Sequence, residues 1–174
     1  MAQTLQHILR QYGRFEEGNE MRRRITDELR RKRMRMVVID DDPTGIQTVH
    51  GCLLLTEINA ARIAEALEDN VPFFYLLVNS RAMTEEAARK IVREAVEATL
   101  EANREKGYNL LFVSRSDSTL RGHFPAESDT IFETLTAAGH QPVMPTLFVP
   151  AFFEAGRMTV EGMHYMAQGD TLIP

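Results

Sequence analysis

The chain has 174 residues, of which 20 are Lys or Arg and 25 are Asp or Glu, so its formal net charge is −5. Hydrophobic residues make up 44% and charged residues 26%, a balance that is typical of globular proteins and excludes wholesale disorder. The acidity argues against a nucleic-acid partner, and no apolar run approaches the ~20 residues of a membrane span. The single cysteine, Cys52, excludes an internal disulfide. Because the N-terminus carries no apolar signal segment, we expect a cytoplasmic protein of one ordinary domain.

Charge is distributed unevenly along the chain. Residues 1–35 hold ten Lys or Arg and five Asp or Glu, a net +5, whereas residues 36–174 carry a net −10. Two apolar stripes in the first segment have helical spacing: Leu5, Ile8 and Leu9, and then, after Gly13 and Gly18, Met21, Ile25 and Leu29. We therefore predict a basic helical N-terminal arm over residues 1–35. Its arginines form either a patch for a polyanion or acidic partner, or a solvated helix face that packs on the acidic body; scarce aromatic residues favour the second.

Residues 36–174 alternate strand-like and helix-like segments. Apolar runs predict strands at 34–40, 52–56, 72–78, 109–113 and 146–149. Helical spacing predicts helices at 58–67, at 84 to about 106, capped by Thr84 and stopped by Gly107, and at 125–138. Continuous apolar strands separated by helices indicate a parallel sheet with both faces covered. The predicted fold class is α/β, with three layers, a mostly parallel sheet flanked by helices, and the N-terminal helical arm.

Polar and charged residues follow four of the predicted strands at the points where the strands end. The four clusters are Asp40-Asp41-Asp42-Pro43-Thr44-Gly45, Asn79-Ser80-Arg81, residues 114–123 and residues 150–157. Ligands of open α/β sheets bind outside the carboxyl ends of the strands, and parallel strands would bring all four clusters to one edge. We therefore expect the functional site there; the alternative is that the same residues only form salt bridges between loops.

The residue types in these clusters favour a small, polar, anionic polyol as the ligand. Three adjacent carboxylates stay ionised beside a cation or hydrogen-bond donors, which suits Mg²⁺ or a carboxylate acting as a base on a hydroxyl. Arginine forks bind carboxylate or phosphate, and hydroxyl side chains bind hydroxyl groups. The arginines are Arg81, Arg115, Arg121 and Arg157, and the hydroxyl residues are Thr44, Ser116, Ser118 and Thr119.

Two short-motif interpretations of the first cluster lack their partner residues. Asp40-x-Asp42-x-Thr44 matches the nucleophile motif of haloacid dehalogenase-like phosphatases. That family also needs a lysine and an acidic pair later in the chain. Here no acidic pair follows Asp117, and the only lysines are Lys32, Lys90 and Lys106. Response-regulator receivers need an Asp after the middle strand and a Lys after the last one. Asn79 stands near the first position, and nothing basic follows Val149 until Arg157. The sequence also has no Gly-rich nucleotide loop of a familiar kind.

A longer set of motifs runs from about residue 36 to residue 165. It comprises Asp41-Asp42-Pro43-Thr44-Gly45 with Gln47-Thr48, Asn79-Ser80-Arg81, Asp117-Ser118-Thr119-Leu120-Arg121-Gly122-His123, Pro150-Ala151-Phe152, Gly156-Arg157-Met158-Thr159 and Gly162-Met163-His164-Tyr165. In order and spacing these motifs resemble the sugar-binding N-terminal domain of the four-carbon acid sugar kinase family, which includes kinases of threonate, erythronate and 3-oxo-tetronate. The DSTLRG element is the most specific of them.

The resemblance implies an ATP-dependent kinase that phosphorylates a terminal hydroxyl of a short sugar acid. ATP and Mg²⁺ would be bound with a second, C-terminal domain that this chain lacks, so we expect the chain alone to be inactive and to bind neither tightly. Residues 36–174 would be an incomplete sugar-acid-binding domain. We expect the missing domain to leave an exposed apolar face that favours self-association into a homo-oligomer.

The resemblance also implies roles for individual residues. Asp42, or in its place Asp41 or Asp117, is the expected base for the attacking hydroxyl, and Arg81 and Arg121 are expected to bind the substrate carboxylate. The other expected substrate-binding residues are Thr44, Gly45, Ser80, Ser118, Thr119, Gly122, His123 and Arg157. One alternative is a stand-alone sugar-acid-binding or interaction module from a truncated or split gene, and another is the phosphatase.

Overall fold

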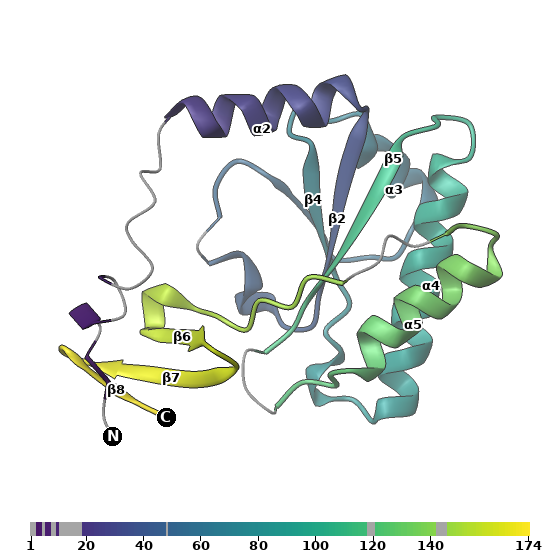
Figure 1. Cartoon of the computed structure of the whole chain (residues 1–174). Coiled ribbons are helices and arrows are strands. Elements are labelled where there is room, and N and C mark those ends of the chain that lie inside the picture. The colour runs from purple at the N-terminus through teal and green to yellow at the C-terminus, as the bar shows by residue number, and fades with distance from the viewer. Residues whose placement is uncertain are drawn as a thin grey trace. The chain divides into compact units, whose positions relative to one another are not determined.

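The computed structural model of the chain describes residues 3–4, 6–7, 10, 19–47, 49–117, 121–141 and 146–174 (Figure 1). The chain divides into two compact units, one of Arg22–Val143 and the other of Met1–Met21 with Met144–Pro174. The first unit contains a parallel sheet and the second an antiparallel one. The boundary at residue 35 between an arm and a sugar-acid-binding domain stays a prediction.

A four-stranded parallel sheet forms the centre of the first unit (Figure 1). Its order is β3 (Leu53–Leu55), β4 (Phe73–Leu77), β2 (Met34–Asp40) and β5 (Asn109–Arg115). Val38 of β2 lies opposite Tyr75 of β4 and Val113 of β5. The four strands lie within two residues of their predicted bounds, because uninterrupted runs of Val, Leu and Phe favour buried parallel strands.

Helices α3 (Ala60–Leu67), α4 (Glu85–Asn103) and α5 (Ala126–Ala137) pack on this sheet, and α4 contacts both of the others. Alternate residues of the two central strands meet the helices in one hydrophobic core, with Val37, Ile39, Phe74 and Leu76 from the sheet and Ile63, Leu67, Val92 and Val96 from the helices. Burial of each such side chain contributes about 1.5–3 kcal/mol to folding. This parallel sheet with flanking helices confirms the predicted α/β class.

The ends of these helices follow the capping signals of the sequence. The Thr84 hydroxyl accepts a hydrogen bond of 3.3 Å from the Ala87 N–H, and the Asn59 side chain accepts one of 2.9 Å from the Ala61 N–H. Gly107 follows α4 with φ +64°, a left-handed conformation that glycine adopts without the steric cost of a side chain. The predicted start of α4 at Thr84 is therefore confirmed, whereas the helix ends at Asn103 with Arg104 as its C-cap, before the predicted end at about residue 106.

The predicted strand at 146–149 is wrong. These residues form no strand in the structure, and Leu147, Phe148 and Val149 are exposed, Leu147 by 86%. Their composition favours a strand, but a strand also needs a neighbouring ladder for its backbone N–H and C=O groups. No strand within the described ranges pairs with this segment. The cluster at 150–157 therefore does not follow a strand of the parallel sheet.

The second unit is built on an antiparallel sheet of order β1 (Gln3–Thr4), β8 (Thr171–Ile173), β7 (Met163–Gln168) and β6 (Arg157–Val160). Before it, η3 (Phe153–Ala155) ends at Gly156, whose carbonyl accepts a hydrogen bond of 2.7 Å from the Ala167 N–H. The last motifs of the longer set thus lie in and around the β6–β7 hairpin. Arg157 is the first residue of β6, in a different unit from the parallel sheet.

The second helix predicted for the arm is present as α2 (Asn19–Arg31). None of its residues is buried, and Met21 and Ile25 of the predicted apolar stripe are exposed. The first predicted stripe, Leu5, Ile8 and Leu9, lies outside the described residues. In the described part of the chain, no helix combines the length and the apolar character that crossing a membrane requires.

Candidate functional site

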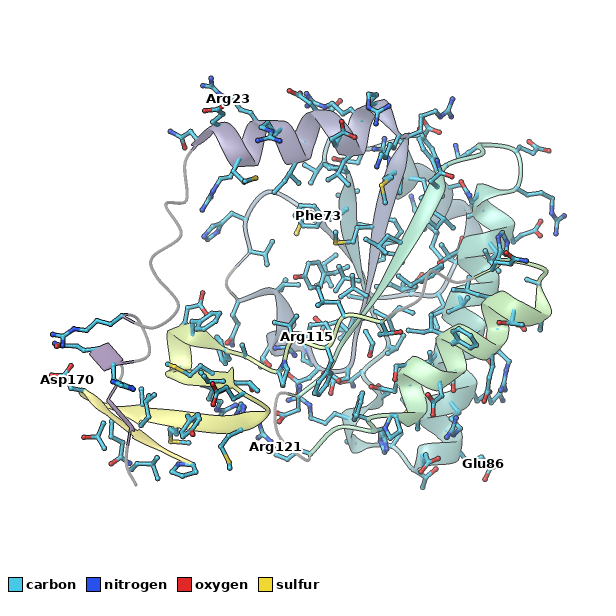
Figure 2. All side chains as sticks on the ribbon, in the orientation of Figure 1. Arg23, Phe73, Glu86, Arg115, Arg121 and Asp170 are labelled. Carbon is cyan, nitrogen blue, oxygen red and sulfur yellow. The ribbon has the colours of Figure 1, made fainter. Side chains whose placement is uncertain are left out.

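Three of the four predicted clusters meet at the carboxyl edge of the parallel sheet. The backbone joins them: the Val78 N–H donates to the Asp40 carbonyl (3.0 Å), the Arg81 N–H to the Asp41 carbonyl (3.1 Å), and the Asp41 N–H to the Arg115 carbonyl (3.2 Å). Figure 2 shows Arg115 at the end of β5, where this edge lies. The convergence predicted for the loops after β2, β4 and β5 is therefore present.

Arg81 is the centre of the charged network at this edge. Its Nε and Nη2 donate to Oδ2 and Oδ1 of Asp41 at 3.0 and 2.8 Å, and its Nη1 lies 3.2 Å from Asp42 Oδ2 and 3.8 Å from Asp117 Oδ2. The hydrogen bond to Asp41, followed by the charges of the three aspartates, raises the pKa of Arg81. One guanidinium thus faces three carboxylates, which explains how adjacent aspartates coexist in a largely buried position.

Two more arginines extend the network to either side. Arg115 Nη1 lies 3.4 Å from Asp40 Oδ1 and 3.5 Å from Asp41 Oδ1, and Arg121 Nη2 pairs with Asp117 Oδ2. Of the three arginine side chains, Arg121 is 64% exposed, whereas Arg81 and Arg115 are 18% and 28% exposed. Arg121 is therefore the cation of this edge with most of its surface open to a ligand.

Asp42 occupies a different environment from its neighbours. It caps η1 (Pro43–Ile46): one carboxylate oxygen accepts hydrogen bonds from the Thr44 hydroxyl and, at 2.8 Å, from the Thr44 N–H. The hydroxyl first and then the N–H lower the pKa of Asp42, so its carboxylate stays ionised. The structure thus brings the predicted residues Asp42 and Thr44 into direct contact.

Asp40 is fully buried beneath η1. Burial raises its pKa from 3.8 to about 6, although the nearby Arg115 and the Asp42 N–H favour the ionised form. Among the described residues nothing hydrogen-bonds its Oδ2 atom. A Cβ on Gly45 would lie 1.9 Å from that atom, so the close approach requires glycine. The phosphatase interpretation needs Asp40 as an accessible nucleophile, and its burial argues against that role.

The sequence did not predict the part played by Glu127. This residue lies in the first turn of α5, is 3% exposed, and accepts a hydrogen bond from the Ser80 hydroxyl through Oε1. Burial raises the pKa of Glu127. Helical spacing was the sequence signal for the burial of Glu127. Ile131 and Thr134, at i+4 and i+7 from it, lie on the same buried face of α5. Their burial places Glu127 inside the molecule.

The loop after β5 contributes a further contact between the predicted residues. His123 Nε2 lies 3.2 Å from the Ser80 carbonyl oxygen, and the Glu127 N–H donates to the His123 carbonyl at 3.3 Å. At Gly122 a Cβ would lie 3.6 Å from Asp41 Oδ2, so this glycine sits beside the aspartates at ordinary contact distance. Ser118 and Thr119 lie outside the described residues. Arg157 lies in the other unit.

Arginines surround the aspartates that the sequence suggested for Mg²⁺. Within the described ranges, no group of three or more His, Cys, Asp or Glu side chains is arranged to hold a metal ion. The aspartates of the edge face Arg81, Arg115 and Arg121 instead. Guanidinium groups therefore neutralise the charge of these aspartates, and their predicted role in placing Mg²⁺ stays a prediction.

Comparison with known proteins gives one match. A protein family described as the sugar-binding N-terminal domain matches residues 36–173, which include the whole parallel sheet except its first two residues and all three clusters at its carboxyl edge. Neither a curated protein nor a solved structure matches the chain.

Proposed function

The chain belongs to the family of sugar-binding N-terminal domains, and on that premise we propose that the charged edge of the parallel sheet binds a four-carbon sugar acid. The observation that carries the proposal is the Asp–Arg network that joins the loops after β2, β4 and β5. Sugar hydroxyls need paired hydrogen-bond acceptors and donors, and a sugar carboxylate needs a cation. This edge offers both within one small area.

Arg121 is the proposed partner of the ligand's carboxylate. It is the most exposed arginine of the network, and its planar fork binds carboxylates through two parallel hydrogen bonds. Arg81 has two of its nitrogens engaged by Asp41, so we assign it to holding the aspartates in place while its Nη1 faces the ligand side. Asp42, whose side chain is 24% exposed, then accepts a hydrogen bond from a hydroxyl of the ligand, and Asp117, at 4%, helps to hold the arginines.

We further propose that the sugar-binding site serves an ATP-dependent kinase of four-carbon sugar acids such as threonate, erythronate or 3-oxo-tetronate. Asp42 would orient the hydroxyl that attacks the γ-phosphoryl group, since Asp41 and Asp117 are more deeply held by arginines. Its lowered pKa makes it a weak base, but phosphoryl transfer depends mainly on positioning and charge stabilisation. ATP and Mg²⁺ would come with a nucleotide-binding domain outside this chain.

Isothermal titration of the purified chain tests the binding proposal. Threonate and erythronate are the ligands, and erythritol is the neutral control with the same number of carbons. We expect the acids to bind and erythritol to bind at least about tenfold more weakly, because it lacks the charged partner of Arg121. Failure of both acids to bind would contradict the proposal.

A pair of arginine variants tests the site itself. Arg121→Gln should weaken binding of the acid roughly tenfold, the effect of losing a charge-assisted hydrogen bond. Arg104→Gln, at an exposed arginine just after α4, should leave the dissociation constant unchanged. We expect no phosphorylation of either acid when ATP and Mg²⁺ are added to this chain. A stand-alone binding module would give the same binding data and would differ in having no kinase domain to act with.

A further inference from the structure

We propose that Glu127 is a positioning residue of the site: by holding the Ser80 hydroxyl from inside the molecule, it fixes the orientation in which Arg81 meets the aspartates and the ligand. The inference rests on the proposed sugar-acid site for its effect on binding. The effect of Glu127 on the orientation of Arg81 depends only on the contacts among Glu127, Ser80 and Arg81.

The Ser80–Glu127 contact is fully enclosed. Ser80 is 0% and Glu127 3% exposed, and the Ser80 hydroxyl donates to Glu127 Oε1. A buried carboxyl group costs free energy unless it is well hydrogen-bonded, and a purely packing role would be filled more cheaply by an apolar side chain. The presence of a carboxyl group at this buried position, hydrogen-bonded to Ser80, therefore points to a specific use of that hydrogen bond.

The backbone geometry connects this hydrogen bond to Arg81. Asn79 has φ +53°, a left-handed conformation that turns the chain sharply at the end of β4 and begins η2 (Ser80–Ala82). After that turn, Ser80 is enclosed beside α5 while the next residue, Arg81, reaches Asp41 with both Nε and Nη2. A change in the place of Ser80 would consequently move the guanidinium relative to Asp41, Asp42 and Asp117.

Glu127 also links two loops of the site. Its N–H donates to the His123 carbonyl, and the His123 ring lies 3.2 Å from the Ser80 carbonyl oxygen. The loop after β4 and the loop after β5 are thus joined on the inner side through Ser80, His123 and Glu127. On the outer side they are joined by Arg81 and Asp117. Because the Glu127 N–H belongs to the backbone, only the Ser80–Glu127 hydrogen bond depends on the Glu127 side chain, and its loss should loosen the outer link.

The test uses four variants with matched roles. Glu127→Ala removes the acceptor, and Ser80→Ala removes the donor. Glu127→Gln keeps an acceptor oxygen on a side chain of the same length, so it should retain the hydrogen bond from Ser80 that Glu127→Ala loses. Glu133→Ala, at an exposed position of the same helix, controls for loss of a carboxylate from α5. Circular dichroism confirms that each variant is folded before its other properties are compared.

Two readouts are measured, of which only one needs a ligand. The first is the dissociation constant for whichever of threonate and erythronate binds the wild type more tightly. The second is the Arg81 Nε–H resonance in a ¹H–¹⁵N spectrum, assigned by its loss in Arg81→Lys. A fixed Arg81–Asp41 pair protects this N–H from exchange, so the signal reports the orientation of the guanidinium without any ligand.

Glu127→Ala and Ser80→Ala should each weaken binding roughly tenfold, and the double variant should be no weaker than the worse single one, because both remove one shared interaction. Both should shift or broaden the Arg81 signal, whereas Glu127→Gln and Glu133→Ala should keep it.

A folded Glu127→Ala with wild-type affinity and an unchanged Arg81 signal would overturn the inference. If Glu127→Ala does not fold, Ser80→Ala decides by the same criteria. If the wild type binds neither acid, the proposed function fails, and the Arg81 resonance still decides the role of Glu127.

Discussion

Gly45 lies directly against the buried carboxyl group of Asp40, so that a Cβ at position 45 would come within 1.9 Å of Asp40 Oδ2 and 2.3 Å of its Cγ. The contact explains why η1, which carries Thr44, can pack closely over the end of β2. It also encloses a carboxyl oxygen that has no hydrogen-bond partner within the described residues. The shape of the loop beside the charged network therefore depends on both residues together.

Gly45→Ala should destabilise the protein by about 1–3 kcal/mol, because the added methyl group forces the loop away from Asp40. Urea unfolding followed by circular dichroism measures the change. Gly122→Ala is the matched control: its Cβ would meet its nearest neighbours at 3.5 Å, an ordinary contact, so it should cost clearly less. Asp40→Ala in the Gly45→Ala background should recover part of the loss, and the absence of any recovery would show that the clash has another cause.

Asp40 should also set part of the pH dependence of stability. Its pKa rises from 3.8 to about 6 in the folded chain, so the native state holds the proton more tightly than the unfolded state does. This group's contribution to stability is therefore largest below pH 4 and decreases through pH 6, by up to about 3 kcal/mol in total. Asp40→Asn removes the titration.

The measurement is the difference between the unfolding free energies of Asp40→Asn and the wild type from pH 4 to pH 8. That difference should increase in favour of the variant as the pH rises through 6 and should then level off. Comparing the two proteins cancels the contribution of the other acidic groups. A difference that is flat across this range would contradict the raised pKa of Asp40.

Arg81→Gln should cost about 3 kcal/mol or more, because it leaves the buried Asp41 carboxylate without its two strongest hydrogen bonds. Arg62→Gln breaks an ion pair with Glu65 in which both side chains are about two-thirds exposed, and it should cost less than about 1 kcal/mol. Thermal unfolding of the two variants separates the cases. Similar losses in both would mean that the Arg81–Asp41 pair contributes no more than a surface pair.

The sequence predicted the parallel sheet well because its strands are long uninterrupted apolar runs such as Phe73–Leu77, a pattern typical of strands buried on both sides. The cap at Thr84 marked the start of α4 for the same local reason, whereas the helix ends at Asn103, before Gly107. The strand prediction for residues 146–149 was wrong because amino-acid composition describes this segment alone. A strand also needs a neighbouring strand to pair with. The cluster at 150–157 therefore does not follow a strand of the parallel sheet, although the sequence had predicted that it would.

The candidate site was predictable only in part. The order of strands and polar clusters placed Asp41, Arg81 and Asp117 at one edge, and the structure brings them together. Which arginine pairs with which aspartate depends on side-chain directions that spacing does not encode, so the two hydrogen bonds from Arg81 to Asp41 were not predicted. The expected role of Arg81 at the ligand's carboxylate stays a prediction. Glu127 was missed because an acidic residue in the first turn of a helix is ordinarily exposed.

A ¹H–¹⁵N titration of the chain with threonate or erythronate tests the sugar-acid site most directly, because it maps which residues respond to the ligand. We predict saturable shifts concentrated in residues 40–45, 79–82 and 115–123, the three loops that the Asp–Arg network joins, and none at the opposite end of the sheet around residues 104–109. Erythritol at the same concentrations should leave these signals in place. Shifts confined to other parts of the chain, or none with either acid, would contradict a sugar-acid site at this edge.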